Sequence, residues 1–280
     1  MRTSSVLALA IAGATLAGCA SVAGPSGSPS PSTPATTAPA PTPTPTPAET
    51  VKPTATAITN GSRRSNQVAI TLDADMTPYA LQRVRSGQYG PQVNYAVIRF
   101  LERREVPATI FVTGMWAQQY PEALARLAAN PLIELGNHTW NHDAWTSSCY
   151  DLPFVAGDRQ KRSEVRRTNA ILRAATGRQP TFFRFPGLCH DQRDVEIVAE
   201  ENLWTVDFDL TASDAFAQDA GRAASAIESE IRPGSIVILH LNGSPNAPAT
   251  APILRQLVRT LDDRQLEPVT LSTLLRPQGK

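Results

Sequence analysis

The sequence predicts an α/β fold, a distorted (β/α) barrel of about seven strand–helix units. Two observations predict it. From about residue 65 onward, short runs rich in β-branched and aromatic residues alternate with helical patterns. The residues best suited to chemistry fall just after these runs, where a barrel of parallel strands carries its active site. Seven units in roughly 215 residues favour a barrel over an open sheet.

The expected strands are short apolar runs bounded by polar or turn-forming residues. In chain order they are Gln67–Leu72, Ala108–Val112, Leu132–Leu135, Thr181–Phe185, Trp204–Phe208, Ile236–Leu239 and Pro268–Leu271. The segments between them carry apolar residues near helical spacing, and some begin with residues suited to a first turn, such as Pro121. The expected helices are Val93–Arg104, Pro121–Ala129, Ser163–Ala175, Asp194–Asn202, Ala220–Ile231 and Ala251–Asp262.

The N-terminus has the features of an export signal. Arg2 gives a short positive end, and residues 6–16 form an apolar stretch too short to span a bilayer as a permanent helix. The stretch ends in Leu16-Ala17-Gly18-Cys19, which resembles the bacterial lipobox, in which the cysteine is lipidated. The alternative is a plain secretory signal with an incidental cysteine. We expect residues 1–19 to be a lipoprotein signal peptide, so that a lipid on Cys19 anchors the protein to the outer face of the bacterial cell membrane.

Residues 20–64 are expected to form a disordered tether. Most of the segment is Pro, Thr, Ser and Ala, with a Pro-Thr repeat from Pro41 to Pro47. It has almost nothing to bury, so it cannot offset the entropy of ordering. About forty residues in extended polyproline form reach roughly 120 Å, which suits work inside a thick cell wall.

The net charge and the number of cysteines limit the binding partners and the cellular compartment that we expect. The formal net charge is +1, which gives no electrostatic case for nucleic acid or for an acidic membrane surface. Contact with the membrane is therefore expected only through the N-terminal lipid, and we expect a monomer. With Cys19 lipidated, Cys149 and Cys189 remain, and two cysteines in an exported protein can pair as a disulfide.

The histidines and several acidic residues cluster at predicted strand ends. The chain has only four histidines, and all of them lie just past such ends. His138 and His142 are four residues apart, which places both imidazoles on one face if the segment makes a helical turn. Together with the acidic residues Asp73 and Asp75 after the first strand, they predict a site for zinc or a similar divalent ion.

Five segments, in order, resemble the motifs of the polysaccharide deacetylases, the NodB-homology domain of carbohydrate esterase family four. They are Thr71-Leu72-Asp73-Ala74-Asp75, His138 to His142, Arg184-Phe185-Pro186-Gly187, Asp207 to Asp214, and Ile238-Leu239-His240. The resemblance covers about residues 66–275. It implies a distorted (β/α) barrel and a catalytic domain over residues 65–280. The implied activity is metal-dependent removal of N-acetyl groups from a cell-wall polysaccharide, either peptidoglycan or a chitin-like amino sugar.

The resemblance also implies roles for individual residues. His138 and His142 match the metal-binding histidines, with zinc as the expected ion. Asp73 matches the general base that acts on a metal-bound water, and His240 matches the general acid that protonates the leaving amine. The supporting residues it implies are Arg184, which pairs with an aspartate such as Asp214 and orients Asp73, and Leu239, in a pocket for the acetyl methyl. Pro186 and Gly187 belong to the third motif. Amide hydrolysis also needs groups that hold the oxyanion, and backbone N–H groups near Gly187 are candidates for this role.

Two departures from the family pattern are visible. The usual first motif has two adjacent aspartates, whereas Ala74 stands here at the second position and Asp75 one residue later. We expect a bulge at the strand end to bring Asp75 to the metal; the alternative is that Asp75 caps the Thr77-Pro78 turn. Asp214 is followed by Ala215 and Phe216, where the family often has tryptophan directly after the aspartate.

Three further questions stay open at the level of sequence. His190 either lies near the metal or substrate, or is a surface residue beside a Cys149–Cys189 disulfide. Aromatic residues either line a sugar groove or pack in the core; they are Trp116, Trp140, Trp145 and Tyr150. The chain as a whole has two rival functions: an esterase for O-acetyl groups of xylan or wall glycans, and a non-catalytic glycan-binding relative with an altered first motif.

Overall fold

The computed structural model of the protein describes residues 52–217 and 219–276. The predicted signal peptide, the predicted lipid site at Cys19 and most of the predicted tether lie outside these residues. Among the helices that are described, none combines the length and the apolar character needed to cross a membrane.

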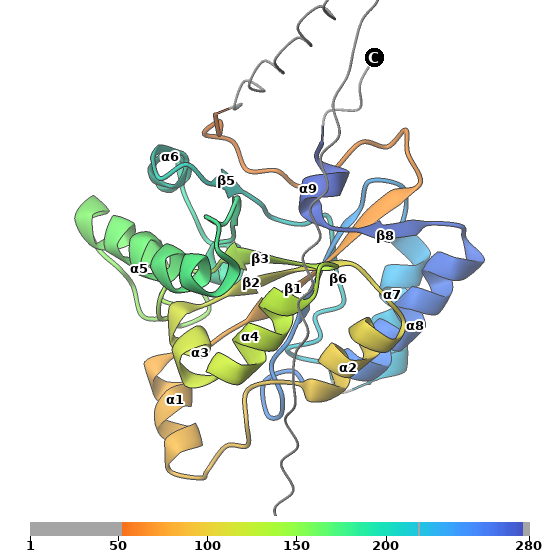
Figure 1. The fold of residues 1–280 in the computed structure, drawn as a ribbon, viewed down its shortest axis with the longest axis horizontal. Coiled ribbons are helices and arrows are strands. Elements are labelled where there is room, and N and C mark those ends of the chain that lie inside the picture. Colours follow the sequence, from red (N-terminus) through yellow and green to blue (C-terminus); the bar gives the residue numbers. More distant parts are fainter. Residues whose placement is uncertain (1–51, 218, 277–280) are drawn as a thin grey trace, which may run out of the picture. The chain divides into compact units, whose positions relative to one another are not determined.

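The described part alternates strands and helices along its length (Figure 1). The strands are β1 (Gln67–Ala74), β2 (Ala108–Val112), β3 (Ile133–Asn137), β4 (Phe182–Phe183), β5 (Trp204–Thr205), β6 (Leu210–Thr211), β7 (Ile236–His240) and β8 (Glu267–Val269). The helices are α1 (Pro78–Arg85), α2 (Tyr95–Arg103), α3 (Gly114–Gln119), α4 (Pro121–Ala129), α5 (Asp158–Thr176), the 3₁₀ helix η1 (Pro186–Leu188), α6 (Gln192–Glu200), α7 (Ala220–Glu230), α8 (Thr250–Asp263) and α9 (Leu271–Leu274).

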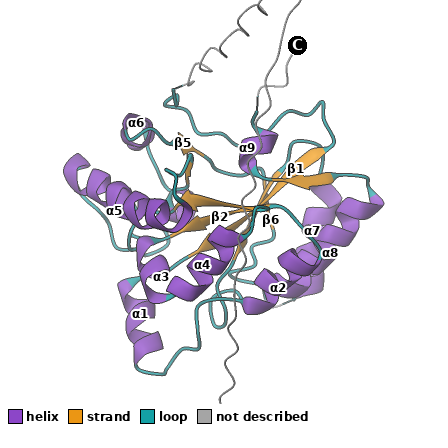
Figure 2. Cartoon of the chain, in the orientation of Figure 1, coloured by secondary structure: helices purple, strands orange, loops and turns teal. Residues whose placement is uncertain are grey.

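The strands form one parallel sheet in the order β5-β4-β3-β2-β1-β7-β6. β8 pairs with the first half of β1. Ala69 of β1 pairs with Ile236 on one side and Val269 on the other, so β8 lies on the edge of β1 opposite to β7. The strands occupy the centre, with α3, α4 and α5 on one side and α2, α7 and α8 on the other (Figure 2).

A short chain connection and a set of hydrogen bonds show that the sheet is curled. β5 and β6 stand at opposite ends of the strand order, yet only residues 206–209 connect them. Such a short link spans at most roughly 17 Å, so the two ends of the sheet lie close together. Arg184, just after β4, hydrogen-bonds across the interior to the hydroxyl of Thr71 on β1 and to the carbonyl of Val206. The predicted distorted (β/α) barrel is therefore confirmed.

β1 shows how the two sides of the sheet differ. Val68, Ile70, Leu72 and Ala74 belong to the large core cluster that includes residues of the surrounding helices. Alternate residues of a strand face opposite sides, so the odd-numbered residues of β1 face the barrel interior. There Thr71 and Asp73 contact Arg184.

The folded part begins earlier than predicted. Residues 52–64 belong to the predicted tether, but Ile58 bridges to Val206 in parallel and Gly61 donates to the carbonyl of Gly234. The side chain of Leu274 also packs so closely on Gly61 that a Cβ there would lie 2.6 Å from it. Because the stretch is polar in composition, its sequence does not predict the backbone pairing that holds it on the domain.

Several elements differ from the sequence prediction at their ends or were missed. β4 and β5 are shorter than predicted, and α5 starts five residues before Ser163, at Asp158. α1 was missed because Thr77-Pro78 was interpreted as a turn. The hydroxyl of Thr77 instead accepts from the backbone N–H of Ala80, and Pro78 starts the helix, which are both features of a helix N-terminus.

Candidate metal centre

The end of β1 presents two aspartates to the same side. β1 pairs with β2 and β7 in regular register up to Ala74 and Asp73, without a bulge. Residues two apart in an extended chain point the same way, so Asp75 follows Asp73 toward the barrel interior, while Ala74 points into the apolar helix layer. The bulge expected at Asp75 is therefore absent and unnecessary. An aspartate at position 74 would face the apolar core, where a lone carboxylate is costly.

His138 and His142 lie in the loop after β3, not in the helical turn that their spacing suggested. Thr139 has φ 65° and His142 has φ 62°, the left-handed region that residues other than glycine rarely adopt. Such backbone conformations cost about 1–3 kcal/mol each and persist where the surroundings impose them. The two imidazoles converge through this loop geometry, with their ring centroids 5.0 Å apart.

Hydrogen bonds from three elements hold the loop in this conformation. The side chain of Asn137 accepts from the N–H of Thr139, and the hydroxyl of Thr168 on α5 donates to the carbonyl of Thr139. Glu164 on α5 accepts from the N–H of Trp140, and Gly114 at the start of α3 donates to the carbonyl of Thr139. The strained loop is thus fixed on both flanks before any ligand binds.

Asp75, His138 and His142 form a cluster with the geometry of metal ligands. Each offers one ligand atom, and these atoms lie within 4.8 Å of one another. Oδ1 of Asp75 lies 3.4 Å from Nε2 of His138 and 3.7 Å from Nε2 of His142. This buried oxygen has no hydrogen-bond partner in the described part of the chain. Nδ1 of His138 contacts the carbonyl of Arg184 at 2.8 Å, which leaves Nε2 as the ligand atom.

The chemistry of this donor set fits a divalent ion. Two imidazole nitrogens and one carboxylate oxygen are ligands that zinc accepts, and three protein ligands leave a position open for substrate or water. Burial disfavours the charged form of Asp75, but the neighbouring imidazoles, His142 foremost, hold its pKa below the ordinary value. Burial lowers the pKa of His142 to about 4, so its ring is neutral and free to bind metal at neutral pH.

Asp73 is held by a buried arginine. Nη1 of Arg184 donates to Oδ1 of Asp73 at 2.8 Å, and both side chains are almost fully buried. Arg184 also donates to the hydroxyl of Thr71 and to the carbonyls of Val206 and Asp207. The other oxygen of Asp73 lies 3.8 Å from Nε2 of His138, so this carboxylate borders the metal cluster.

Asp214 pairs with His240, not with Arg184 as predicted. Oδ1 of Asp214 lies 2.8 Å from Nδ1 of His240, and its other oxygen accepts from the backbone N–H of His240 and from the hydroxyl of Thr250. The guanidinium of Arg184 is already occupied by β1 and by the segment after β5, which excludes the predicted pair. Nε2 of His240 faces the cluster, 3.8 Å from Oδ2 of Asp75.

Leu239 does not lie where the sequence placed it. It is fully buried in the core cluster with Val237 and Leu241, because alternate residues of β7 face opposite sides and His240 takes the interior side. The prediction that Leu239 lines an acetyl pocket is therefore wrong.

The loop after β4 lies close to a disulfide. Cys149 and Cys189 are joined, across a separation of 40 residues. Pro186 is buried, and a Cβ on Gly187 would lie 2.5 Å from Sγ of Cys149, so the loop leaves no room for a side chain there. His190 pairs with Asp207 at 3.1 Å and packs against Phe185; it is not among the cluster ligands.

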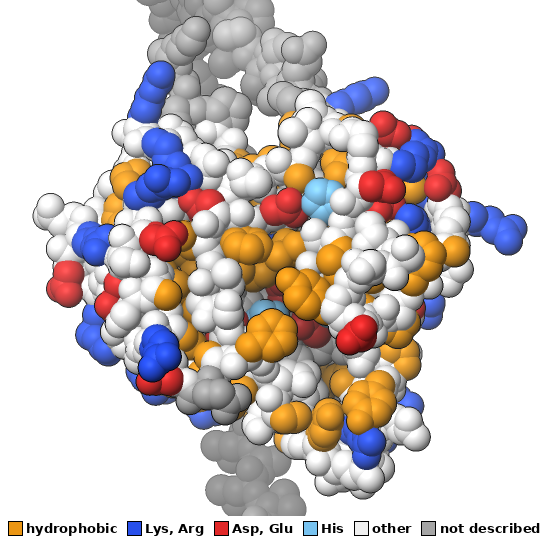
Figure 3. All heavy atoms as spheres, turned by 180° about the vertical axis from the view of Figure 1, so that it is seen from behind, with side chains coloured by type: hydrophobic (Ala, Val, Ile, Leu, Met, Phe, Trp, Pro, Cys, Tyr) orange, Lys and Arg blue, Asp and Glu red, His pale blue; other side chains and the backbone are white. Residues whose placement is uncertain are grey.

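Of the four aromatic residues singled out in the sequence, two are buried, Trp140 is partly buried and Tyr150 is exposed. Trp116 and Trp145 are buried and belong to the core, whereas Tyr150 and Phe216 have relative exposures of 74% and 73%. The rings of this exposed pair stack, with centroids 6.5 Å apart. Tyr150 directly follows Cys149 of the disulfide, and Phe216 follows Asp214 by two residues. On the face shown in Figure 3, hydrophobic side chains gather around a hollow in which histidine and acidic side chains are visible.

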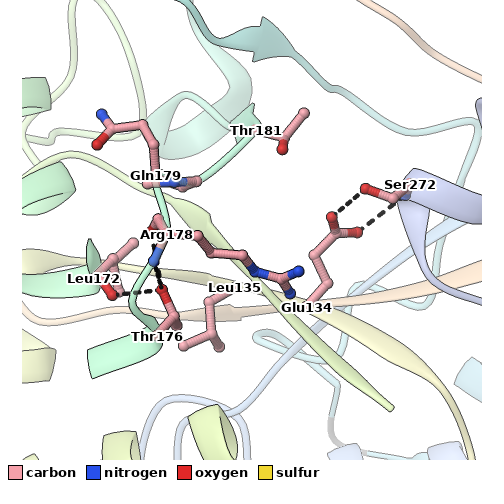
Figure 4. Close-up of a pocket in the computed structure, with 9 residues that line it drawn as sticks. Glu134, Leu135, Leu172, Thr176, Arg178, Gln179, Thr181 and Ser272 are labelled. Carbon is pink, nitrogen blue, oxygen red and sulfur yellow. Dashed lines mark hydrogen bonds between the residues drawn. The ribbon is translucent and has the colours of Figure 1, made fainter. Parts of the chain in front are cut away.

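A second, small hollow lies away from this cluster. It has a volume of about 60 Å³ and is lined by Glu134, Arg178 and Ser272, among others (Figure 4). Glu134 stands at the start of β3, while His138 follows its end. The carboxylate of Glu134 accepts from the backbone and hydroxyl of Ser272 and from Thr109. These hydrogen bonds join α9 to the sheet, so the buried carboxylate of Glu134 has a structural role.

Residues 60–205, just over half of the chain, match the sequence profile of the family described as polysaccharide deacetylase. The chain belongs to this family. The match covers β1 to β5 and so includes Asp73, Asp75, His138, His142 and Arg184.

Individual relatives agree with the family assignment. A peptidoglycan-N-acetylglucosamine deacetylase of Bacillus cereus is 23% identical over 189 residues, which are 67% of this chain and 66% of that protein. The crystal structure of a peptidoglycan N-acetylglucosamine deacetylase superposes with a TM-score of 0.67 at 20% identity, over 79% of this chain and 92% of the other. A pseudoenzyme of carbohydrate esterase family 4 from Bacillus anthracis gives a TM-score of 0.64 at 17% identity, over 79% and 69%. At these identities the structural likenesses show the fold.

Proposed function

We propose that this protein is a metal-dependent deacetylase that hydrolyses N-acetyl groups of a cell-wall polysaccharide, peptidoglycan or a chitin-like chain. One observation carries the proposal: the cluster of Asp75, His138 and His142 is bordered by two separately supported acid–base groups, Asp73 with Arg184 and His240 with Asp214. The B. cereus relative, named for the deacetylation of peptidoglycan N-acetylglucosamine, supports the substrate class.

The charges and hydrogen bonds of the site assign a different role to each group. A divalent ion, for which we propose zinc, supplies the positive charge that polarises an acetyl carbonyl and favours deprotonation of water. Asp73 accepts the proton of the attacking water, and Arg184 orients this carboxylate through the hydrogen bond to Oδ1. His240 donates a proton from Nε2 to the leaving amine nitrogen, while Asp214 holds Nδ1 on the far side of the ring. The N–H groups near Gly187 remain our proposal for the oxyanion contacts.

A polymeric substrate suits the surroundings of the cluster. The exposed Tyr150–Phe216 pair offers flat apolar surface beside two loops that carry site residues. Large exposed apolar groups on a soluble surface commonly mark binding sites. We infer that the substrate is a chain of sugar rings bound to a monomer of this protein.

Acetate release tests the proposal against its two rivals. Purified, metal-loaded protein is incubated with peptidoglycan, with a chitooligosaccharide and with O-acetylated xylan, and acetate is measured. We expect release from an N-acetyl substrate at least tenfold faster than from xylan. Preference for xylan would make the protein an O-acetyl esterase. Binding of glycan without acetate from any substrate would make it a non-catalytic relative like the B. anthracis pseudoenzyme.

The pH dependence of turnover tests the acid role of His240. Burial opposes the charged ring, but the hydrogen bond to Asp214 outweighs it and raises the pKa of His240 to about 9. Asp214→Asn removes the negative charge, so the pKa falls and the protonated acid is lost at lower pH. The alkaline limb of the pH–kcat profile should therefore move to lower pH. An alkaline limb identical to that of the wild type would contradict this role.

We also propose that the protein is exported and anchored by a lipid on Cys19, with the residues after it reaching into the cell wall. The proposal rests on the order of charge, apolar stretch and lipobox at the N-terminus. A Cys19→Ala protein should appear in the medium; if it stays in the membrane fraction like the wild type, the anchor lies elsewhere.

A further inference from the structure

Asn242 stands where β7 would continue beside the end of β1. In the parallel register Asp73 pairs with His240, so Asp75 and Asn242 are each two residues further along. The last backbone bond of this ladder runs from the N–H of Leu241 to the carbonyl of Asp73 at 2.7 Å. Beyond it the chains separate: β1 leads through Thr77 into α1, and β7 leads into the loop before α8.

The side chain of Asn242 replaces the missing backbone pairing. Its Nδ2 donates to the carbonyl of Asp75 at 2.8 Å, and its Oδ1 accepts from the N–H of Asp75 at 3.0 Å. Asn242 is fully buried, so neither bond competes with bulk water. One carboxamide thus satisfies both backbone groups of a single residue. This fixes the peptide planes on either side of Asp75 and, with them, the direction of its Cα–Cβ bond.

We propose that Asn242 is a positioning residue of the metal centre, which holds the Asp75 carboxylate between His138 and His142. Asp75 lies outside β1 and has no strand ladder to orient it. Its Oδ1 also receives no hydrogen bond in the described residues that would aim it. The carboxylate therefore depends on its backbone for direction. Thr113 donates to the carbonyl of Ala74 just before it, and Asn242 holds both backbone groups of Asp75 itself. This inference rests on the proposed function only in assuming that the cluster binds a metal.

Cobalt titration tests the proposal, because Co²⁺ reports both its affinity and its coordination geometry by visible absorption. Asn242→Ala should weaken Co²⁺ binding about ten- to a hundredfold, the range typical of residues that orient a metal ligand. Its absorption spectrum should change in intensity or position. Far-UV circular dichroism checks the fold, and Asn242→Leu, which keeps the side-chain volume, replaces the alanine variant if that protein does not fold.

Gln92→Ala is the matched control. Gln92 is also a fully buried carboxamide, and it donates to the carbonyl of Ser244 in the loop that follows Asn242, but it has no hydrogen bond to Asp75. We expect its Co²⁺ affinity to stay within about twofold of wild type while its thermal stability falls. Equal losses of affinity in both variants, or an unchanged affinity in the Asn242 variant, would overturn the proposal. A wild-type protein that binds no Co²⁺ would overturn the metal centre itself, whereas cobalt binding without deacetylation leaves this test valid.

Discussion

Replacing Asp73 with asparagine should reduce turnover by roughly a hundredfold to ten-thousandfold, the usual contribution of a general base. Asparagine has the shape of aspartate and keeps an oxygen for the hydrogen bond from Arg184, so the barrel interior should remain ordered. It cannot accept a proton from water at neutral pH. Because Asp73 is not one of the three cluster ligands, the bound metal should remain.

Two measurements on the same preparation decide this prediction. Metal content is determined by elemental analysis, and kcat by acetate release from a chitooligosaccharide. Thr71→Val is a suitable control, because Thr71 also contacts Arg184 but carries no proton-accepting group of comparable basicity. Normal turnover in Asp73→Asn, or loss of its metal, would show that Asp73 is not the base assigned here.

Replacing Asp75 with asparagine should act first on the metal. We expect metal binding to be lost, whereas in Asp73→Asn the metal stays and turnover is lost. The substitution removes the negative charge and the only carboxylate ligand of the cluster. We expect metal affinity to fall by more than the ten- to hundredfold typical of residues that merely orient a ligand. Turnover should recover in part at high metal concentration, because Asp73 and His240 are unchanged. Isothermal titration of metal-free protein with zinc measures the affinity.

The two variants together separate the aspartates. If metal affinity is unchanged in Asp75→Asn and collapses in Asp73→Asn, the two roles are reversed. The base would then have to be sought elsewhere in the barrel. His142→Ala provides a reference for the loss of one ligand, because its imidazole is the other partly exposed member of the cluster.

The fold and the set of site residues could be predicted largely because both depend on short-range patterns. Alternating β-rich and helical segments indicate a parallel sheet, and parallel strands gather their C-terminal ends at one edge. Asp73, His138 and His240 lie at the C-terminal ends of β1, β3 and β7, so they come together whatever the exact strand lengths. The same period-two rule places Asp75 beside Asp73, a consequence that the expectation of a bulge obscured.

The remaining features depend on contacts between distant segments. The partner of Asp214 is set by the position of β7 next to β6, and the direction of Leu239 by the side of β7 that His240 occupies. The positive φ at Thr139 is held by hydrogen bonds from α3 and α5, and these distant contacts give the loop a form that a spacing of four residues does not predict. Asn242 carries no local signal, since its importance appears only when the β1–β7 register is known.

Zinc titration of the metal-free enzyme tests the central claim most directly. The wild-type protein is freed of metal with a chelator, its fold is checked, and acetate release is followed as zinc is added back. The site built from Asp75, His138 and His142 predicts no activity without metal and a linear rise in activity that saturates at about one equivalent of zinc per chain. Full acetate release from protein shown to be free of metal would contradict the account.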